Sequence, residues 1–440
     1  MEYRGAAPEL RMQIHEAFRN LEAFMTFKAL AARALDAVRV LVGCVPALIW
    51  TAHPASAQTT TVGTVPQLES AVANANRSGG NRTILLLDGV YSLNGTLNVT
   101  APNVTIAGKS GVRENVVIQG DAMRDTARIG NLIRVSARNF GLSGVTLQKS
   151  GFHLIQIAGE SDADAPVIRN CILRDAYQQM IKVSNDPAAP GVSADNGLVE
   201  HCLFEYSAGI GPQFYIGGID AHASKNWIVR NNTFRNIISP GRSVAEFAIH
   251  FWDGSANNTV EKNLIVNCDR GIGFGLDRKG NMGGTIRNNM IYHAANAGRF
   301  ADAGIALTES PGTQVYNNTI IMDNDFPRAI EYRFAVTTGI LIANNLTNKA
   351  IVSRDGASGI VSRNVTNAVG RWFVSPASGD LHLASAIGAV VASGQTVPGL
   401  GDDFDGQPRP SGAGVDIGAD QFVAKPALPS PGSSQRIDRR

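Results

Sequence analysis

Four tetrads between residues 231 and 320 repeat one pattern: Asn231-Asn232-Thr233-Phe234, Lys262-Asn263-Leu264-Ile265, Asn288-Asn289-Met290-Ile291 and Asn317-Asn318-Thr319-Ile320. Related tetrads begin at Asn170, His201, Asn344 and Arg363. The second residues of the eight tetrads, at positions 171, 202, 232, 263, 289, 318, 345 and 364, recur at intervals of 19 to 31 residues. A period that is too short for a domain and is sustained over eight copies indicates a solenoid.

Each copy consists of short apolar segments around the tetrad, without helical periodicity, which indicates short β-strands. Asparagine at a bend adopts the left-handed conformation with little penalty, and its amide can bond the asparagines of the coils above and below. One coil cannot bury its apolar face, whereas stacked coils share a continuous interior. We therefore predict an all-β fold, a right-handed parallel β-helix of about ten coils.

The open ends of a solenoid expose unpaired strands, so we expect a cap at each end. Residues 64–77 begin with a capping-box pattern, Thr64-Val65-Pro66-Gln67, and continue with apolar residues at helical spacing, which predicts an N-terminal helical cap. Residues 376–422 lose the period and are predicted to form a C-terminal cap. The β-helix domain is thus predicted to span residues 58–422, and residues 423–440 are predicted to be a disordered tail.

The N-terminal segment has the pattern of a secretory signal. A basic stretch ends at Arg33 and Arg39, an uncharged run covers residues 40–52, and Ala55-Ser56-Ala57 precedes Gln58. The uncharged run is too short to span a bilayer. We therefore exclude residues 1–57 from the fold and expect a secreted or periplasmic protein without a membrane anchor.

Composition excludes several classes of protein. The chain has 440 residues, of which 44% are hydrophobic and 17% charged, which argues against a disordered polyampholyte, a coiled coil and a collagen. A net charge of +2 gives no reason to expect nucleic-acid binding.

The cysteines outside the signal segment number three and are widely spaced: Cys171, Cys202 and Cys268. We therefore expect free thiols. We also expect a monomer.

Several features together resemble the pectate-lyase-like right-handed β-helix superfold. They are the helical cap followed by Asp88-Gly89-Val90-Tyr91, the repeated asparagine turns, and two C-terminal stretches, residues 403–410 (DFDGQPRP) and 415–419 (VDIGA). The resemblance covers residues 60–420. It implies an enzyme acting on a polysaccharide, since the superfold includes polysaccharide lyases, hydrolases and epimerases. No catalytic motif of one specific family is present to carry over.

Aligning the strands that follow the asparagine turns by their inward isoleucines predicts a single outward face. The aligned segments include Ile181-Lys182-Val183-Ser184, Ile219-Asp220-Ala221-His222, Ile249-His250-Phe251-Trp252, Ile330-Glu331-Tyr332-Arg333 and Ile351-Val352-Ser353-Arg354. Alternation turns the second and fourth residues of each segment outward. We expect Asp220, His222 and His250 to lie within contact distance of one another. The alternative is a solvated sheet face whose cross-rung pairs only stabilise the stack.

This face suggests β-elimination on an acidic, uronic acid-containing polysaccharide, the substrate that basic and aromatic side chains together would suit. Elimination needs a base, a group that neutralises the uronate carboxylate, and an acid. His222 or His250 is the candidate base. Lys182, Arg333 or Arg354 is the candidate neutralising group, and Tyr215 or the second histidine the candidate acid. Further candidate substrate-binding residues are Asp220, Trp252 as an exposed indole, Arg270, Glu331 and Arg354.

Other functions remain open at this point. A glycoside hydrolase needs two carboxylates, for which Asp220 with Glu246 or Asp253, and Asp302 with Glu309 or Glu331, are candidates. A uronate epimerase on the same fold and a noncatalytic glycan-binding or structural solenoid are further alternatives. No cofactor is assigned. Ca²⁺ is the metal that the resemblance suggests, although only Asp220 and Glu331 supply carboxylates on the strand face. Residues 402–406 (DDFDG) resemble a calcium loop but lack its other features, and we interpret them as a turn.

Overall fold

The computed structural model describes residues 57–276, 278–298, 300–412 and 414–423. The expected signal segment, residues 1–57, and the expected tail, residues 423–440, lie outside the described residues except for residues 57 and 423. Among the described residues, no helix is both long enough and apolar enough to cross a membrane.

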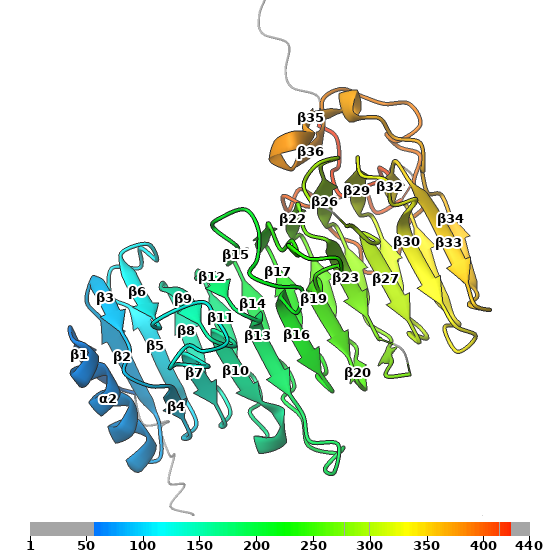
Figure 1. The fold of residues 1–440 in the computed structure, drawn as a ribbon. Helices are drawn as coiled ribbons and strands as arrows, with labels where there is room; N and C mark the ends of the chain where they lie inside the picture. The colour runs from blue at the N-terminus through cyan, green and yellow to red at the C-terminus, as the bar shows by residue number, and fades with distance from the viewer. Residues whose placement is uncertain (1–56, 277, 299, 413, 424–440) are drawn as a thin grey trace, which may run out of the picture. The chain divides into compact units, whose positions relative to one another are not determined.

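Three parallel sheets run along the solenoid (Figure 1). The first contains β1 (Gln58–Val62), β2 (Arg82–Leu86), β5 (Val104–Gly108), β8 (Gly141–Ser143), β11 (Val167–Arg169), β14 (Leu198–Glu200), β17 (Ile228–Arg230), β21 (Thr259–Glu261), β25 (Thr285–Arg287), β28 (Gln314–Tyr316), β31 (Ile340–Ala343) and β34 (Gly359–Ser362). The second contains β3 (Gly89–Ser92), β6 (Val116–Gln119), β9 (Thr146–Ser150), β12 (Ile172–Ala176), β15 (Leu203–Glu205), β18 (Thr233–Arg235), β22 (Leu264–Val266), β26 (Met290–His293), β29 (Thr319–Met322) and β32 (Leu346–Thr347).

The third sheet, called the site sheet below, contains β4 (Leu97–Val99), β7 (Ile133–Val135), β10 (Ile155–Ala158), β13 (Gln179–Ser184), β16 (Gly217–His222), β19 (Phe247–Trp252), β23 (Arg270–Phe274), β27 (Ile305–Thr308), β30 (Arg328–Arg333) and β33 (Ala350–Arg354). Successive coils add one strand to each sheet, which gives a parallel β-helix of about eleven turns. The predicted fold class is therefore confirmed, with about one more turn than expected.

The first and second residues of each asparagine tetrad have different structural roles. The first residue takes the left-handed conformation, with φ of 55° at Asn231, 55° at Lys262 and 53° at Asn288. The second residue points inward and bonds to the next coil: Asn263 Nδ2 donates to Asn289 Oδ1 at 3.0 Å, and Asn289 Nδ2 donates to Asn318 Oδ1 at 2.9 Å. At these bends the ladder satisfies buried backbone groups, because the amides of Asn263 and Asn289 also bond backbone atoms of neighbouring coils.

Cysteines replace asparagine at two rungs of the ladder. Cys171 and Cys202 are buried free thiols, and the backbone N–H of Cys171 lies 3.4 Å from Cys202 Sγ. Cys268 is also a buried free thiol. The prediction of free thiols is confirmed for these three residues.

Stacked apolar side chains fill the interior. Ile181, Ile219 and Ile249 occupy equivalent positions on adjacent strands of the site sheet and are fully buried. On the second sheet the rings of Phe204 and Phe234 stack with centroids 4.4 Å apart. This shared interior fixes which residues face outward from the site sheet, because neighbouring residues of a strand point to opposite faces.

The N-terminal helix α2 (Val65–Arg77) covers the first coils as predicted. The hydroxyl of Thr64 accepts a hydrogen bond from the backbone N–H of Gln67 at 3.4 Å, while Gln67 Oε1 accepts from Gly63 rather than from Thr64. The buried face of α2 consists of Leu68, Ala71, Val72 and Ala75.

The segment expected to form a C-terminal cap packs along the outside of the later coils. It includes η3 (Pro376–Ser378) and β36 (Asp380–Leu383) and is preceded by η2 (Gly370–Trp372) and β35 (Phe373–Ser375), and β35 pairs antiparallel with β36. Its apolar residues, such as Leu381 and Leu383, form a second core with Val266, Met290 and Ile321 of the second sheet. The remaining elements are η1 (Gly159–Ser161) and the short parallel pair β20 (Ser255–Ala256) and β24 (Asn281–Met282).

Candidate active site

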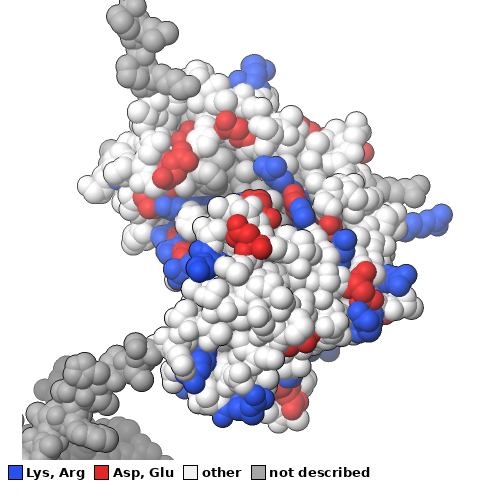
Figure 2. Space-filling view, turned by 90° about the vertical axis from the view of Figure 1, so that its left-hand side faces the viewer, with Lys and Arg blue, Asp and Glu red and all other residues white. Residues whose placement is uncertain are grey.

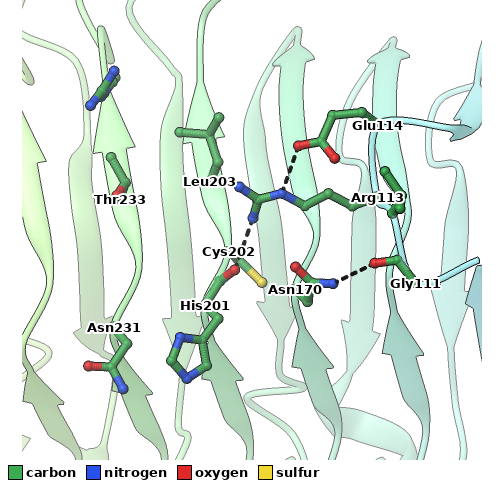
Figure 3. A pocket seen from close by; sticks show the side chains of 11 residues that line it. Gly111, Arg113, Glu114, Asn170, His201, Cys202, Leu203, Asn231 and Thr233 are labelled. Atoms are coloured by element: carbon green, nitrogen blue, oxygen red, sulfur yellow. Dashed lines mark hydrogen bonds and ion pairs between the residues drawn. The ribbon is translucent and has the colours of Figure 1, made fainter.

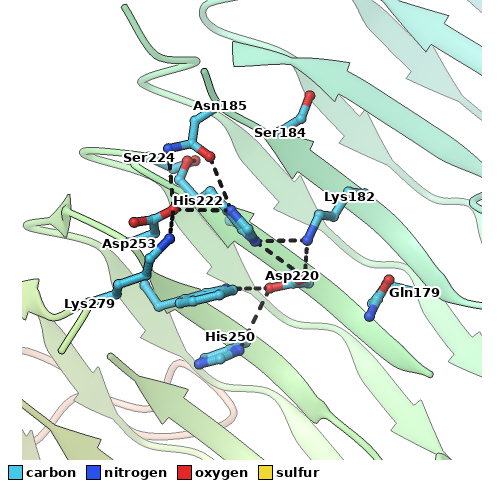
Figure 4. A network of polar contacts seen from close by, with 12 residues as sticks. Gln179, Lys182, Ser184, Asn185, Asp220, His222, Ser224, His250, Asp253 and Lys279 are labelled. Carbon is cyan, nitrogen blue, oxygen red and sulfur yellow. Dashed lines mark hydrogen bonds and ion pairs between the residues drawn. The ribbon is translucent and has the colours of Figure 1, made fainter. Parts of the chain in front are cut away.

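The site sheet has the register that the sequence alignment predicts. Lys182 on β13 pairs with Asp220 on β16, which in turn pairs with His250 on β19. One step further along the strands, His222 pairs with Trp252. These five side chains, called the Lys182–Asp220 cluster below, lie together on the outward face (Figure 4).

Asp220 is the centre of the cluster and is 4% exposed. Its Oδ2 forms an ion pair with Lys182 Nζ, and its Oδ1 accepts a hydrogen bond from Trp252 Nε1 at 2.7 Å. His222 Nε2 and His250 Nδ1 each lie 3.6 Å from one of the two carboxylate oxygens. Burial alone would raise the pKa of Asp220, but the contact with His222 and the charge of Lys182 hold that pKa well below its usual range. Asp220 is therefore a carboxylate throughout the physiological pH range.

The contacts of His222 define which ring nitrogen carries the proton. Its Nδ1 lies 3.1 Å from Asn185 Oδ1 and 3.4 Å from Asp253 Oδ2, and both of these atoms are acceptors. Its Nε2 lies 2.7 Å from Lys182 Nζ, which has only hydrogens to donate. Nδ1 therefore donates to Asn185 or Asp253, and in the neutral ring the lone pair of Nε2 faces the lysine ammonium, with Asp220 Oδ2 3.6 Å away.

His250 lies beneath the surface of the cluster. It is 1% exposed, and burial lowers its pKa to about 4. Its Nε2 lies 3.3 Å from the carbonyl oxygen of Gly275, and its ring stacks on the indole of Trp252 with an interplanar angle of 7°. The hypothesis that His250 acts as the base or the acid is therefore not supported, because no substrate atom can reach a side chain buried to this degree.

Trp252, one of the five residues of the cluster, also lines a hollow of about 740 Å³. The hollow is lined by Trp252, Leu276, Arg278, Lys279, Glu309 and Phe334. Trp252 is half-buried, not fully exposed as expected, because its indole lies against both histidine rings and donates to Asp220. The Nζ of Lys279 lies 5.5 Å from the centre of the indole ring and 3.1 Å from Asp253 Oδ2. The hollow thus has aromatic and basic walls beside the cluster.

Arg333, Arg354 and Glu331 form a separate group on β30 and β33. Glu331 Oε2 lies 2.8 Å from Arg328 Nη1 and 2.9 Å from Arg354 Nη1, and Arg333 Nε lies 2.7 Å from Asp355 Oδ2. β30 is four strands from β16 in the site sheet, which is about 19 Å at the usual strand spacing. The hypothesis that Arg333 or Arg354 neutralises the same sugar that meets His222 is therefore wrong. Glu331 is likewise too far away to bind that sugar.

Arg270 and Tyr215 also differ from their expected roles. Arg270 Nε lies 3.1 Å from Asp302 Oδ2, and its guanidinium lies 5.2 Å from the centre of the Phe247 ring. Tyr215 is an exposed residue, and the hydrogen bonds of this residue within the described chain all involve its backbone. Neither side chain contacts the Lys182–Asp220 cluster through a hydrogen bond or ion pair in the described residues.

The sequence did not single out Asn185 and Lys279, and it considered Asp253 only as half of a carboxylate pair. Asn185 follows β13 directly and Asp253 follows β19 directly, so both are the first loop residues after a strand of the site sheet. Asn185 Nδ2 also donates to Asp253 Oδ2 at 3.3 Å. The sequence could have identified Asn185 and Asp253 from their positions directly after a strand, because parallel strands in register bring such residues to the same edge of the sheet.

Two further polar residues lie at the opposite end of the same strands. The side-chain amide of Gln179 on β13 is fully buried, and neither its oxygen nor its nitrogen has a hydrogen-bond partner in the described residues. Glu246 precedes β19, and burial raises the pKa of its carboxyl group. A Cβ built on Gly217 would lie 3.2 Å from Gln179 Cγ and 3.3 Å from Glu246 Cβ, so these two side chains flank the glycine.

The carboxylates of the site sheet do not fit a calcium site. Asp220 is ion-paired with Lys182, and Glu331 is ion-paired with two arginines four strands away. Ca²⁺ requires six or more oxygen ligands around one point, and the oxygens here are separated and already paired with cations. We therefore assign no step to calcium at this site.

A second hollow, of about 670 Å³, lies on the asparagine-turn face (Figure 3). Arg113 crosses it, with Nη1 3.0 Å from the carbonyl oxygen of His201 and Nε 3.2 Å from Glu114 Oε1. Both contacts fix Arg113 within the protein, which makes this hollow a poorer candidate for catalysis than the Lys182–Asp220 cluster. Figure 2, a view of the N-terminal end, shows acidic and basic side chains mixed over that surface.

Comparison with known proteins supports the fold. Residues 131–321 match a family model described as a right-handed β-helix region. No curated protein matches the chain. Together with the three parallel sheets, the family match identifies the chain as a right-handed parallel β-helix.

Solved structures with similar folds include three carbohydrate-active enzymes. An alginate lyase from Paenibacillus sp. has 14% identity and a TM-score of 0.39, with 70% of this chain and 99% of that chain covered. A PL6 family polysaccharide lyase from Pseudopedobacter saltans has 12% identity and a TM-score of 0.41, with coverage of 82% and 99%. Endopolygalacturonase I from Stereum purpureum has 11% identity and a TM-score of 0.37, with coverage of 70% and 100%. These similarities concern the fold alone.

Proposed function

We propose that the protein is a polysaccharide lyase that cleaves an acidic, uronic acid-containing polysaccharide by β-elimination at the Lys182–Asp220 cluster. The observation that carries the proposal is the contact of 2.7 Å between Lys182 Nζ and His222 Nε2, beside the buried carboxylate of Asp220. A neutral imidazole that faces an ammonium group offers a proton acceptor and a positive charge at one point. Removal of the proton next to a carboxylate needs both of these groups.

In the proposed reaction, the uronate carboxylate draws the Lys182 ammonium away from His222 Nε2, and the lone pair that this frees accepts the proton from C5 of the uronate. The ammonium of Lys182 stabilises the negative charge that develops on the uronate carboxylate. The electron pair of the broken C5–H bond then forms the C4–C5 double bond, and the C4–O bond breaks. The leaving oxygen takes a proton from a cationic group at the rim, and Lys279 is the exposed cation beside Trp252. Asp220 does not react and holds Lys182 in place through their ion pair.

The hollow beside the cluster fits the proposed substrate. The rings of Trp252 and Phe334 provide apolar surfaces that can pack on sugar rings, while Arg278 and Lys279 can pair with carboxylates of neighbouring uronate residues. A sugar bound in this hollow against Trp252 would lie near His222, since the imidazole and indole rings are 4.3 Å apart. The signal pattern of residues 1–57 adds the proposal that the protein is exported, and we expect it to act as a monomer.

Two enzymatic alternatives involve the same surface. A hydrolase would need two accessible carboxylates, and Asp220 is unsuitable because it is buried and ion-paired. The pair that remains near the hollow is Asp253 and Glu309, of which Asp253 already contacts Asn185, His222 and Lys279. An epimerase would use the same proton abstraction and return the proton to the opposite face of C5. The product therefore distinguishes the three reactions.

The test is a screen of the purified protein on alginate, pectate, glycosaminoglycans and glucuronan. We expect one class of polymer to yield products with the ultraviolet absorbance of an unsaturated uronate, and the His222→Gln variant to lose this activity. New reducing ends without that absorbance would indicate hydrolysis. Inversion at C5 without chain cleavage, detected by NMR, would indicate epimerisation. Binding without any chemical change would contradict the proposal and support a noncatalytic solenoid.

A further inference from the structure

A histidine and three aspartates converge in the C-terminal segment, away from the proposed active site. His382 lies on β36, Asp405 lies in the turn after Phe404, and Asp420 follows Ala419. One ligand atom from each of these three residues lies within 4.8 Å of the other two. The fourth residue, Asp380, contacts the other side of the His382 ring. Three segments that are distant in sequence therefore bring their metal-binding side chains to one point.

The hydrogen bonds of the turn at residues 403–407 fix the positions of Asp405 and Asp420 beside His382. Asp403 Oδ1 accepts from the backbone N–H groups of Asp405 and Gln407 at 3.0 and 2.7 Å, and its Oδ2 accepts from Gln421 at 3.0 Å. Asp403 thereby fixes both Asp405 and the chain next to Asp420. Residues 402–406 form a turn, as interpreted from the sequence, and this turn presents the exposed side chain of Asp405 to His382.

Asp380 orients the imidazole of His382 for metal binding. Asp380 Oδ1 lies 2.6 Å from Nδ1, so it accepts the proton of that nitrogen and leaves Nε2 on the side of Asp405, whose Oδ2 is 2.9 Å away. Metal-ligating histidines usually donate their second N–H to a carboxylate or carbonyl in this way, which fixes the tautomer. In a charged His382, a proton on Nε2 would lie between this nitrogen and Asp405 Oδ2. A metal ion bound to both atoms would take the place of that proton.

Asp420 is the second, independent indication of a ligand. It is 8% exposed, and its one hydrogen bond in the described residues is from the backbone N–H of Leu383 to Oδ2. No lysine or arginine of the described chain forms an ion pair with Asp380, Asp405 or Asp420. A doubly protonated His382 carries one positive charge against these three carboxylates, and Arg409 acts on Asp420 only from beyond ion-pair distance. A buried carboxylate without a cationic partner is costly, and a bound cation would remove that cost.

We propose that His382, Asp405 and Asp420 bind one divalent cation that accepts mixed nitrogen and oxygen ligands, Zn²⁺ or Mn²⁺, with Asp380 as the residue that orients His382. One imidazole with two carboxylates and a water molecule suits these ions, whereas Ca²⁺ prefers ligand sets made only of oxygen. The ion would join β36 to the two following segments of the C-terminal region. This site is therefore structural and does not depend on the proposed lyase activity.

The test uses the tag-free full-length protein, stripped with EDTA and titrated with Zn²⁺, Mn²⁺ or Ca²⁺. We expect one equivalent of Zn²⁺ or Mn²⁺ by calorimetry and by elemental analysis after dialysis. At metal concentrations 100-fold above the dissociation constant, the melting temperature should rise by about 3 °C. His382→Gln and Asp405→Asn should each abolish stoichiometric binding, and Asp380→Asn should weaken it about 10- to 100-fold.

Asp402→Asn is the matched control, since Asp402 lies in the same turn but pairs with Lys262. This variant should bind metal like the wild type. The site residues Asp405 and His382 are partly accessible, so their variants are expected to fold, and circular dichroism of the metal-free proteins checks this. The proposal is overturned if the wild type binds no equivalent of Zn²⁺ or Mn²⁺, if it binds Ca²⁺ alone, or if both site variants retain binding. None of these results bears on the activity of the His222 site.

Discussion

Lys182 Nζ and His222 Nε2 lie 2.7 Å apart although both groups carry a positive charge when protonated. Asp220 makes this approach favourable, because its buried carboxylate pairs with the ammonium and also lies 3.6 Å from His222 Nε2. Asn185 and Asp253 hold the proton of His222 on Nδ1. With the proton on Nδ1, the lone pair of Nε2 points to Lys182, the cation of the cluster. An isolated surface histidine would have no such fixed orientation.

The first prediction concerns His222 as the base. Replacing it by glutamine removes the proton acceptor but keeps a polar side chain of similar length. We expect turnover to fall by about 10²- to 10⁴-fold, the usual contribution of a general base, while the melting temperature changes little. Turnover is measured by the absorbance of the unsaturated product. The control is His201→Asn, which restores the asparagine of the tetrad pattern at an exposed left-handed position. Equal activity of the two variants would exclude His222 as the base.

The second prediction concerns the stability that Asp220 contributes. Asp220→Asn keeps the shape of the side chain but leaves Lys182 without its carboxylate, so unfolding should become easier by about 3–5 kcal/mol. Since the folded pKa of Asp220 is lowered, this stabilisation is present above its unfolded pKa near 4 and is lost only as pH falls towards the folded value. Urea unfolding at pH 7 and at acid pH measures both effects.

Asp253→Asn is the comparison for Asp220. Asp253 pairs with Lys279, whose side chain is half exposed, and such pairs contribute about 1 kcal/mol or less. The two variants should therefore differ in the free energy of unfolding that they lose. An equal loss would show that burial does not explain the contribution of the Asp220 ion pair to stability.

The sequence predicted the solenoid and the composition of the cluster because both depend on period and register. The isoleucine column that passes through Ile219 and Ile249 is fixed by burial, and alternation then turns Asp220, His222 and His250 outward. How deeply each outward side chain is buried was not predictable from this pattern. Loops and the indole of Trp252 cover His250 almost completely, so a residue on the outward face is still buried.

The sequence also did not predict which residues of the outward face lie close together along the solenoid. Arg333 and Arg354 have the correct face, but Glu331 and Asp355 pair with them several coils from His222. Asn185 and Lys279 lie in loops, where no period indicates the direction of a side chain. The metal-binding residues of the C-terminal segment were missed for the same reason, since His382 and Asp405 meet only through the packing of that segment on the second sheet.

The third prediction concerns acid sensitivity caused by two of the three buried histidines in the described residues, His250 and His153. Burial lowers the pKa of His250 and of His153 to about 4, whereas an unfolded histidine titrates near 6.5. The unfolded chain therefore takes up protons that the native state excludes, and stability should fall as pH drops from 6.5 towards 4. Each histidine adds about 1.4 kcal/mol per pH unit to the slope within this window.

Variants of the two histidines test this origin of the slope. His250→Gln and His153→Gln should each reduce the pH dependence of the free energy of unfolding by about one proton, and the double variant by about two. Denaturant unfolding at several pH values provides the slope. His201→Asn, at an exposed position, should leave it unchanged. A double variant with the wild-type slope would assign the acid sensitivity to other groups.

The fourth prediction concerns the asparagine ladder and its two cysteine rungs. Asn289 Nδ2 donates to the carbonyl of Val260 and to Asn318 Oδ1, and Asn289 Oδ1 accepts from the backbone of Asn263, all in the buried interior. Asn289→Cys leaves these groups without good partners and should cost at least about 2 kcal/mol in denaturant unfolding. The reverse change, Cys202→Asn, extends the ladder by one rung, since Asn232 Oδ1 already accepts from the backbone N–H of residue 202 at 2.9 Å. We expect Cys202→Asn to be as stable as the wild type or more stable. If both changes destabilise the protein equally, the loss reflects disturbed packing, and the amide ladder is not what holds the coils in register.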